Sequence, residues 1–186
     1  MAKNKRKDFT VEIEIPAEID ATVEKNKIVM KKGGKELTKK ISDIVNLDKE
    51  GSRIILSVKK AKKIDKREFG TAKSHIKNMI EGLMTGFEYE LEICNVHFPI
   101  TVIFDKAKSE FIIKNQLGEK CPRIIKTPGD IEVEIKIPRI KIKSYDLDKA
   151  GQAAASLEKR SMVRNRDRNK FQDGIFIIKK PGVEFL

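Results

Sequence analysis

Apolar and polar residues alternate along much of the first half of the chain, which predicts short β-strands. Residues 9–15 alternate with a period of two, as in a strand with one buried face. The runs 28–32 and 35–41 flank Gly33-Gly34. Two consecutive glycines tolerate the positive φ angles of a tight turn, so these runs predict a β-hairpin. The apolar run 53–58 predicts one more strand.

The period changes to that of a helix between residues 66 and 86. Apolar side chains recur there at intervals of three and four, at Phe69, Ala72, Ile76, Met79, Ile80 and Leu83. Gly86 follows them, and glycine commonly ends a helix in the left-handed conformation. We therefore expect an amphipathic helix that is closed by Gly86.

The second half repeats this order of strands followed by one helix. Strands are predicted at 89–96, 100–104, 110–114, 121–125, 131–137 and 140–143. A helix is predicted from Asp148 to about Met162, with Asp148 as its N-cap. Its apolar face is small, because it consists of Ala153, Ala154 and Leu157. A last strand is predicted at 174–178.

Two segments of the chain also resemble each other in sequence. Residues 16–31 and 128–143 align without gaps and share a proline, two isoleucines and a final lysine. Together with the repeated element order, this match predicts a duplication. We expect an α+β protein of two tandem domains, each an antiparallel sheet with one packed helix. The predicted domains are 1–86 and 87–186.

The charge of the chain narrows the choice of partner. There are 40 Lys and Arg against 28 Asp and Glu, a net charge of +12, which indicates a polyanion. The longest strongly apolar stretch, 175–178, is too short to span a membrane, and no apolar region follows the basic residues 1–7. Cys94 and Cys121 do not suggest a disulfide framework. We expect a soluble protein of the reducing cytoplasm that has no membrane partner.

Candidate catalytic and metal sites are weak. Cys94 and His97 have the spacing C-x-x-H, but zinc needs four ligands and the other His and Cys are poorly placed. The pairs Glu12/Glu14 and Glu132/Glu134 lie two residues apart on strands, which favours solvated sheet faces over an acid/base pair. Gly33-Gly34-Lys35 lacks the rest of a phosphate-binding loop. We expect no enzyme activity, no metal, no cofactor and no small-molecule substrate.

Two basic stretches are the stronger candidates. Residues 159–170 hold six basic side chains and one acid, and the arginines 164, 166 and 168 alternate there. Guanidinium groups can bind phosphate with two hydrogen bonds at once, so this pattern favours RNA or DNA. Part of it has a simpler role, because Lys159 and Arg160 suit the negative end of a helix dipole. Residues 59–67, called the lysine cluster below, hold six basic side chains in nine and predict a weaker, outer contact.

Aromatic residues make up 6% of the chain, and there is no tryptophan. Aromatic platforms on which single-stranded bases stack are therefore not indicated. Contacts to the phosphates and shape of a folded RNA fit this composition better.

Three ordered motifs resemble a known family, the archaeal and eukaryotic form of large-subunit ribosomal protein six. The first comprises Gly70-Thr71, the stretch from Ile76 to Phe87 and Leu91-Glu-Ile93, and the second is Leu117-Gly-Glu-Lys120. The third comprises Gly151-Gln-Ala-Ala154, Arg164-Asn-Arg-Asp167 and Phe171-Gln-Asp-Gly-Ile175. The resemblance covers nearly the whole chain.

The resemblance implies a tandem duplicated fold and binding to large-subunit ribosomal RNA, mainly through the C-terminal domain. It also implies a place near the stalk base and the factor-binding region, beside other ribosomal proteins. The contact segment that it implies, residues 159–174, is called the basic segment below. We expect RNA contacts from Lys159, Arg160, Arg164, Asn165, Arg166, Arg168, Lys170, Gln172, Lys179 and Lys180, and secondary contacts from Lys59, Lys60, Lys62 and Lys63.

One alternative stays open at this point, a free-standing regulator that binds nucleic acid. It would need a recognition helix, whereas both predicted helices use an apolar face for packing. The sequence leaves three matters undetermined: the individual nucleotides contacted, the protein neighbours of the N-terminal domain, and the order of residues 159–174 without RNA.

Overall fold

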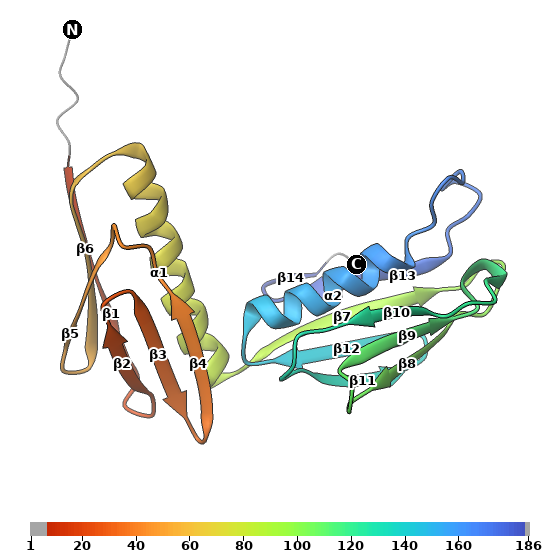
Figure 1. The fold of residues 1–186 in the computed structure, drawn as a ribbon, viewed down its shortest axis with the longest axis horizontal. Coiled ribbons are helices and arrows are strands. Elements are labelled where there is room, and N and C mark those ends of the chain that lie inside the picture. The colour runs from red at the N-terminus through yellow and green to blue at the C-terminus, as the bar shows by residue number, and fades with distance from the viewer. Residues whose placement is uncertain (1–6, 185–186) are drawn as a thin grey trace, which may run out of the picture. The chain divides into compact units, whose positions relative to one another are not determined.

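The chain folds into two compact units that meet in sequence between Thr85 and Gly86. The structure is a computed structural model that describes residues 7–184, so most of the basic N-terminal run lies outside the described part. Both units are α+β, with one helix and antiparallel sheets in each (Figure 1). The predicted fold class is therefore confirmed.

Unit 1, which ends at Thr85, consists of two three-stranded sheets and one long helix. Its sheets have the strand orders β1-β6-β5 and β2-β3-β4, and all their neighbouring strands are antiparallel. The elements are β1 (Lys7–Glu14), β2 (Asp20–Glu24), β3 (Lys27–Lys32), β4 (Lys35–Lys40), β5 (Asn46–Glu50), β6 (Arg53–Ala61) and α1 (Lys63–Met84).

The predicted turns and faces of unit 1 are present. Gly33 and Gly34 join β3 to β4 with φ angles of 56° and 80°, as expected for this hairpin. The apolar face of α1 is buried against both sheets, and Ile76 is fully inaccessible to solvent. Gly86 has a φ of 74° directly after the C-cap Thr85, which confirms its predicted role in closing the helix.

Unit 2, which begins at Gly86, adds strands to the same plan. Its sheets have the orders β10-β9-β8 and β11-β12-β7-β13-β14. The elements are β7 (Phe87–Cys94), β8 (Thr101–Asp105), β9 (Glu110–Lys114), a short 3-10 turn (Gln116–Gly118), β10 (Arg123–Lys126), β11 (Glu132–Lys136), β12 (Arg139–Ser144), α2 (Leu147–Ser161), β13 (Gly174–Lys180) and β14 (Val183–Glu184).

Helix α2 packs closely on the larger sheet of unit 2, as its small apolar face predicts (Figure 1). Ala153, Ala154 and Leu157 are fully buried. The predicted N-cap is wrong by two residues. Asp146, not Asp148, precedes the helix with extended backbone, and its side chain accepts a hydrogen bond from the backbone N–H of Asp148. Both are aspartates near the helix start, so the sequence alone could not distinguish them.

The two units share one topology. The two segments that resemble each other in sequence, however, do not occupy equivalent positions in it. The order β1-β6-β5 corresponds to β7-β12-β11, and β2-β3-β4 corresponds to β8-β9-β10. The aligned segments 16–31 and 128–143 contain the hairpins β2–β3 and β11–β12, which occupy different places in this order. Their similarity reflects hairpin composition, because both consist of short alternating strands around a turn.

The remaining differences concern strands at sheet edges. Strands β2, β5 and β14 were not predicted. The sequence of β5, Asn-Leu-Asp-Lys-Glu, has one partly buried side chain among exposed ones, so it carries almost no apolar alternation. An edge strand of this kind is held by its pairing with β6 rather than by burial of its own side chains.

Candidate nucleic-acid interface

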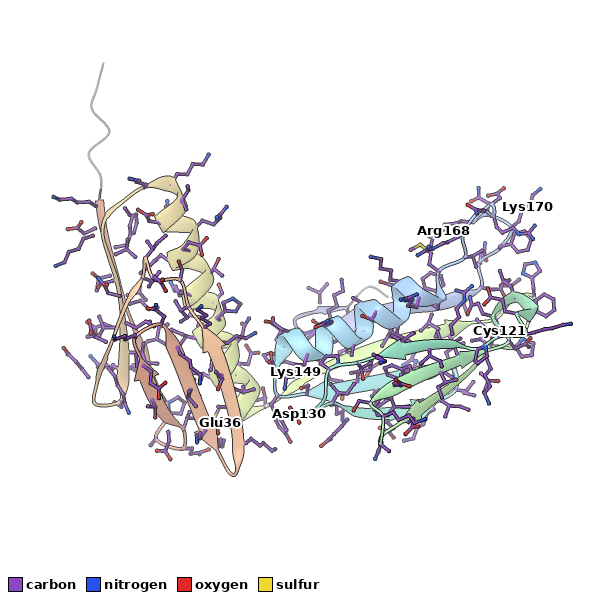
Figure 2. The ribbon with its side chains drawn as sticks, in the orientation of Figure 1. Glu36, Cys121, Asp130, Lys149, Arg168 and Lys170 are labelled. Atoms are coloured by element: carbon purple, nitrogen blue, oxygen red, sulfur yellow. The ribbon has the colours of Figure 1, made fainter. Side chains whose placement is uncertain are left out.

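The basic segment runs from the last turn of α2 through residues 162–173 into β13. Figure 2 shows Arg168 and Lys170 on the loop between these two elements. Seven of the predicted contact residues here are exposed: Lys159, Arg160, Arg164, Asn165, Arg166, Arg168 and Lys170. Gln172 is exposed too. Within residues 7–184, none of these basic side chains forms an ion pair with an acid, so their charge is free to act on a polyanion.

One aspartate organises the tip of this loop. The backbone N–H groups of Lys170 and Phe171 donate to the carbonyl oxygen of Asp167, at 3.1 and 2.9 Å. The backbone N–H of Asn169 donates to the Asp167 carboxylate at 3.0 Å. The single acid in the run 159–170 therefore forms a local turn and is not paired with an arginine.

Two of the alternating arginines lie over phenylalanine rings. The Arg166 guanidinium is 5.4 Å from the ring centroid of Phe171, and that of Arg168 is 5.9 Å from the ring centroid of Phe176. Such contacts restrict the guanidinium group and leave its in-plane N–H donors for an anion. Gly174 allows one of them, because a Cβ at this position would lie 3.1 Å from the Phe176 ring.

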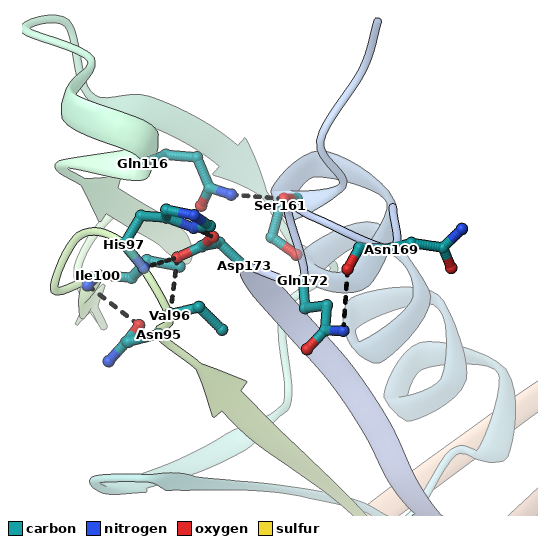
Figure 3. A network of polar contacts seen from close by, with 9 residues as sticks. All are labelled: Asn95, Val96, His97, Ile100, Gln116, Ser161, Asn169, Gln172 and Asp173. Carbon is teal, nitrogen blue, oxygen red and sulfur yellow. Dashed lines mark hydrogen bonds and ion pairs between the residues drawn. The ribbon is translucent and has the colours of Figure 1, made fainter. Parts of the chain in front are cut away.

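A buried carboxylate fixes the end of the loop (Figure 3). Asp173 is 2% exposed and accepts hydrogen bonds from the backbone N–H groups of Val96 and His97, both at 2.9 Å. The Nδ1 atom of His97 lies 2.7 Å from the second carboxylate oxygen. The His97 ring also stacks on Phe171, with centroids 4.9 Å apart. Residues 95–99, which follow β7, thus hold the loop from the side.

These hydrogen bonds outweigh the burial of Asp173. Burial alone would raise the pKa of this carboxyl group. The hydrogen bonds from the backbone and ring of His97, and from the backbone of Val96, lower the pKa to about 2. Asp173 is therefore ionised throughout the physiological pH range.

The start of the loop is fixed by polar groups from the β9–β10 connection. The Gln116 side chain, 1% exposed, donates through Nε2 to the Ser161 carbonyl oxygen at 2.7 Å (Figure 3). The buried Ser161 hydroxyl accepts a hydrogen bond from the backbone N–H of Ile175 at 3.0 Å. Both ends of residues 162–173 are consequently joined to buried structure.

The Arg123 side chain caps a carbonyl group at the C-terminal end of α2. Its Nη1 atom donates to the Arg160 carbonyl oxygen at 2.6 Å, and it forms an ion pair with Glu119. The hydrogen bond from Arg123 lowers the pKa of the Glu119 carboxyl group. Because Arg123 satisfies a terminal carbonyl of the helix, the side chains of Lys159 and Arg160 need not do so.

The structure does not bring every predicted contact residue together. Lys179 and Lys180 lie at the far end of β13, about 20 Å along the strand from the loop by strand geometry. Lys179 is also half-buried. Any contact that these two lysines make is therefore separate from that of the loop.

The lysine cluster lies in unit 1, where β6 ends and α1 begins. Lys59, Lys60, Lys62 and Lys63 are all exposed. The backbone N–H of Lys60 donates to Asp8 at 2.6 Å, and that of Lys62 donates to Asp65 at 2.8 Å. These lysines extend from the end of β6 and the start of α1. The carboxylates of Asp8 and Asp65 accept hydrogen bonds from backbone N–H groups of the cluster.

The other candidates have structural roles. Arg53 pairs with Glu12 and Glu14 on an exposed sheet face, and Glu132 and Glu134 are exposed, so the prediction of solvated faces is confirmed. Burial raises the pKa of the Cys94 thiol, and so do the carboxylates of Glu92 and Asp173. In the described part of the chain, no three His, Cys, Asp or Glu residues gather as a metal site.

The residues that hold the loop are not evident from the sequence. The sequence predicts an ordinary strand or loop side chain at His97 and no role for Asp173, Gln116 or Arg123. Phe98 is also 44% exposed next to His97, which the low aromatic content does not indicate. The motif around Asp173 is the only signal that the sequence offers, and it does not show which residue Asp173 contacts.

Relatives of known name share most of this chain. No helix in the described part of the chain is long and apolar enough to cross a membrane. No family model matches the chain. Three archaeal relatives are each named Large ribosomal subunit protein uL6. The protein of Methanobrevibacter smithii is 35% identical over 170 residues, which cover 91% of this chain and 94% of that protein. That of Staphylothermus marinus is 40% identical over 171 residues, covering 89% and 91%. That of Haloarcula marismortui is 31% identical over 172 residues, covering 92% and 96%.

Proposed function

This chain belongs to the uL6 family of large ribosomal subunit proteins, and we propose that it binds large-subunit ribosomal RNA through its basic segment. As a family member it is a structural constituent of the large subunit, and it is located on the ribosome in the cytoplasm. Its role in translation is that of a bound component rather than an enzyme.

One observation carries the proposed RNA contact. Arg164, Arg166, Arg168 and Lys170 are exposed on a loop whose two ends are joined to buried structure, and in the described chain none of them pairs with an acid. Loose surface arginines would lose much conformational entropy on binding phosphate. A loop that is already held, with two guanidinium groups over aromatic rings, loses less.

The position within the subunit is a further part of the proposal. The three sequence motifs resemble the family form that lies near the stalk base and the factor-binding region, beside other ribosomal proteins. We assign this chain to the same region. A free-standing regulator is disfavoured because the relatives that share most of this chain are named as proteins of the large ribosomal subunit.

Co-sedimentation combined with footprinting tests both parts. Large subunits that lack this protein are incubated with it at moderate and high salt, sedimented, and probed by hydroxyl-radical cleavage of the RNA. We expect stable association and protection at the stalk base and factor-binding region. The triple change of Arg164, Arg166 and Arg168 to Ala should remove that protection, whereas the same change at Lys59, Lys60 and Lys62 should retain it. Protection confined to another RNA region would refute the proposed location.

A further inference from the structure

We infer that Asp173 and His97 are positioning residues, which hold the basic segment in its RNA-binding form before any RNA is bound. This inference rests on the proposed function. Asp173 cannot contact phosphate favourably, since it is an anion and is 2% exposed. The effect of Asp173 on RNA must therefore pass through the segment that it holds. The His97 ring is partly exposed, and its positioning role is assigned from its contacts with Asp173 and Phe171.

The end of the segment is anchored by Asp173. This residue immediately precedes β13, whose first residue, Gly174, pairs with Cys94 at the end of β7. The three hydrogen bonds from Val96 and His97 tie the carboxylate to residues that are 76 and 77 positions away in sequence. Hydrogen bonds to an ionised group are about twice as strong as neutral ones, so three of them form a strong anchor for the end of the loop.

The anchor is connected to an arginine through two rings. His97 contacts Asp173 through Nδ1 and stacks on Phe171 through its ring face. Phe171 in turn lies beneath Arg166. A continuous series of contacts therefore leads from the buried carboxylate through the imidazole and the phenyl ring to a guanidinium group on the surface (Figure 3 shows its buried part).

The rest of the loop contrasts with its anchored end. Residues 164–170 are all exposed, and the backbone hydrogen bonds formed among them are those of the Asp167 turn. Burial of their side chains does not select one conformation. If the anchor were lost, the binding-competent form would be only a fraction of the population, and the apparent dissociation constant would rise in inverse proportion to that fraction.

The test uses the full-length protein and a large-subunit RNA fragment in filter-binding titrations across a range of salt concentrations. Asp173→Asn keeps the size of the side chain but removes its charge, and His97→Phe keeps a ring against Phe171 but removes the Nδ1 contact. The matched control is Asp130→Asn. Asp130 is an exposed carboxylate, paired with Lys149 at 2.6 Å, at the opposite end of unit 2 from Arg168 (Figure 2).

We expect each of the two variants to weaken RNA binding about tenfold, the scale expected for loss of one charge-assisted hydrogen bond. The double variant should cost less than the sum of the two single variants, because both changes remove the contact between His97 and Asp173. The log–log salt slope should stay at its wild-type value, since the same phosphates are contacted once the RNA is bound. Asp130→Asn should leave both the affinity and the slope unchanged.

Amide hydrogen exchange supplies a second readout. Exchange in residues 163–172 should be faster in the free variants than in the free wild type, and protection should return in the RNA complex. If Asp173→Asn fails to fold, His97→Phe decides the question, because it retains both backbone hydrogen bonds to Asp173. Wild-type affinity in a folded His97→Phe variant would overturn the inference, and so would additive losses in the double variant. Failure of the proposed function is distinct, because the wild type itself would then show no salt-dependent binding.

Discussion

The chain carries a concentrated basic stretch in each unit, and the two differ in how their side chains are held. The lysine cluster in unit 1 extends from the end of β6 and the first turn of α1, and its nearby acids bind backbone N–H groups. The basic segment in unit 2 runs from the last turn of α2 to β13 and has a buried anchor, with two arginines over aromatic rings. Similar charge is thus presented by two different local structures.

The polarity of the helices adds to this difference. Lys62 and Lys63 lie at the positive end of the α1 dipole, where added positive charge is unfavourable for the helix. Lys159 and Arg160 lie at the negative end of α2, where they are favourable. We therefore expect the two stretches to differ in RNA affinity, although each holds six basic residues.

The largest expected effect comes from removing the charges of one stretch at a time. The triple change Arg164→Ala, Arg166→Ala, Arg168→Ala should weaken binding to a large-subunit RNA fragment by about a hundredfold or more, since under the proposed function each arginine would donate charge-assisted hydrogen bonds to phosphate. The free energy of unfolding should fall by no more than about 1–2 kcal/mol, because these side chains are exposed and two of them contact an aromatic ring. Filter binding and urea denaturation measure the two quantities.

The matched triple change is Lys59→Ala, Lys60→Ala, Lys62→Ala. It removes the same number of positive charges from unit 1 and should cost clearly less affinity, because an ammonium group cannot bind phosphate with two fixed hydrogen bonds. A larger loss of affinity from the lysine variant than from the arginine variant would show that unit 1, not unit 2, makes the main RNA contact.

Separating the units sharpens the comparison further. We predict that fragments 1–86 and 87–186 each fold alone, because each unit has its own buried core and is of a size that small domains commonly have. Fragment 87–186 should retain most of the RNA affinity, and fragment 1–86 little of it. Circular dichroism melts and filter binding provide the test. Absence of a cooperative transition in both fragments would contradict the two-domain interpretation.

Acid should destabilise unit 2 through Asp173. The folded-state pKa of this group is about 2 against an ordinary value of 3.8, so its stabilising contribution is complete above pH 4 and is lost as the pH falls towards 2. The shift corresponds to about 2 kcal/mol. Asp173→Asn should be less stable than wild type by about this amount at pH 7, and the difference should shrink as the pH falls and vanish below pH 2.

Tyrosine fluorescence can follow this unfolding selectively. The only two tyrosines of the chain, Tyr89 and Tyr145, both belong to unit 2. Urea titrations at several pH values therefore report on unit 2 within the intact protein. Stability curves of wild type and Asp173→Asn that stay parallel from pH 7 to pH 2 would show that the carboxylate does not anchor the loop.

The smallest expected effects come from two glycines. Gly70 lies in α1 with open space around it, so Gly70→Ala should stabilise unit 1 by up to about 1 kcal/mol and leave RNA binding unchanged. Gly174 has a φ of 158° and a Cβ there would meet the Phe176 ring, so Gly174→Ala should strain the backbone next to Asp173, displace the ring under Arg168 and weaken binding at least a few-fold. Equal effects of the two changes on affinity would refute this role of Phe176.

Much of the fold could be predicted from periodicity alone. The helix in unit 1 and the strand β6 bury a continuous apolar face, and such faces leave a clear signal in the sequence. Strand β5 leaves none, because its stability comes from backbone pairing at a sheet edge. The equivalence of the two units could not be read from the best-matching segments, since one β-hairpin resembles another in composition.

For the candidate interface, too, one part could be predicted from the sequence and another could not. The basic segment is contiguous, so its charge is visible in the sequence and its arginines can be named. Its support is not visible, because His97 and Asp173 are 76 residues apart and only the pairing of β13 with β7 brings them together. Local charge can therefore be predicted from sequence, whereas the long-range contacts that position it require the fold.

The most direct test of the central claim, that the basic segment holds phosphates, is the salt dependence of two single variants. The dissociation constant for one large-subunit RNA fragment is measured at several salt concentrations for wild type, Arg166→Ala and Lys63→Ala. The slope is that of the logarithm of the constant against the logarithm of the salt concentration. We predict that Arg166→Ala lowers the magnitude of the slope by about 0.7–0.9 for each phosphate that the variant no longer binds, and that Lys63→Ala lowers it less. A wild-type slope in Arg166→Ala together with a reduced slope in Lys63→Ala would contradict the claim.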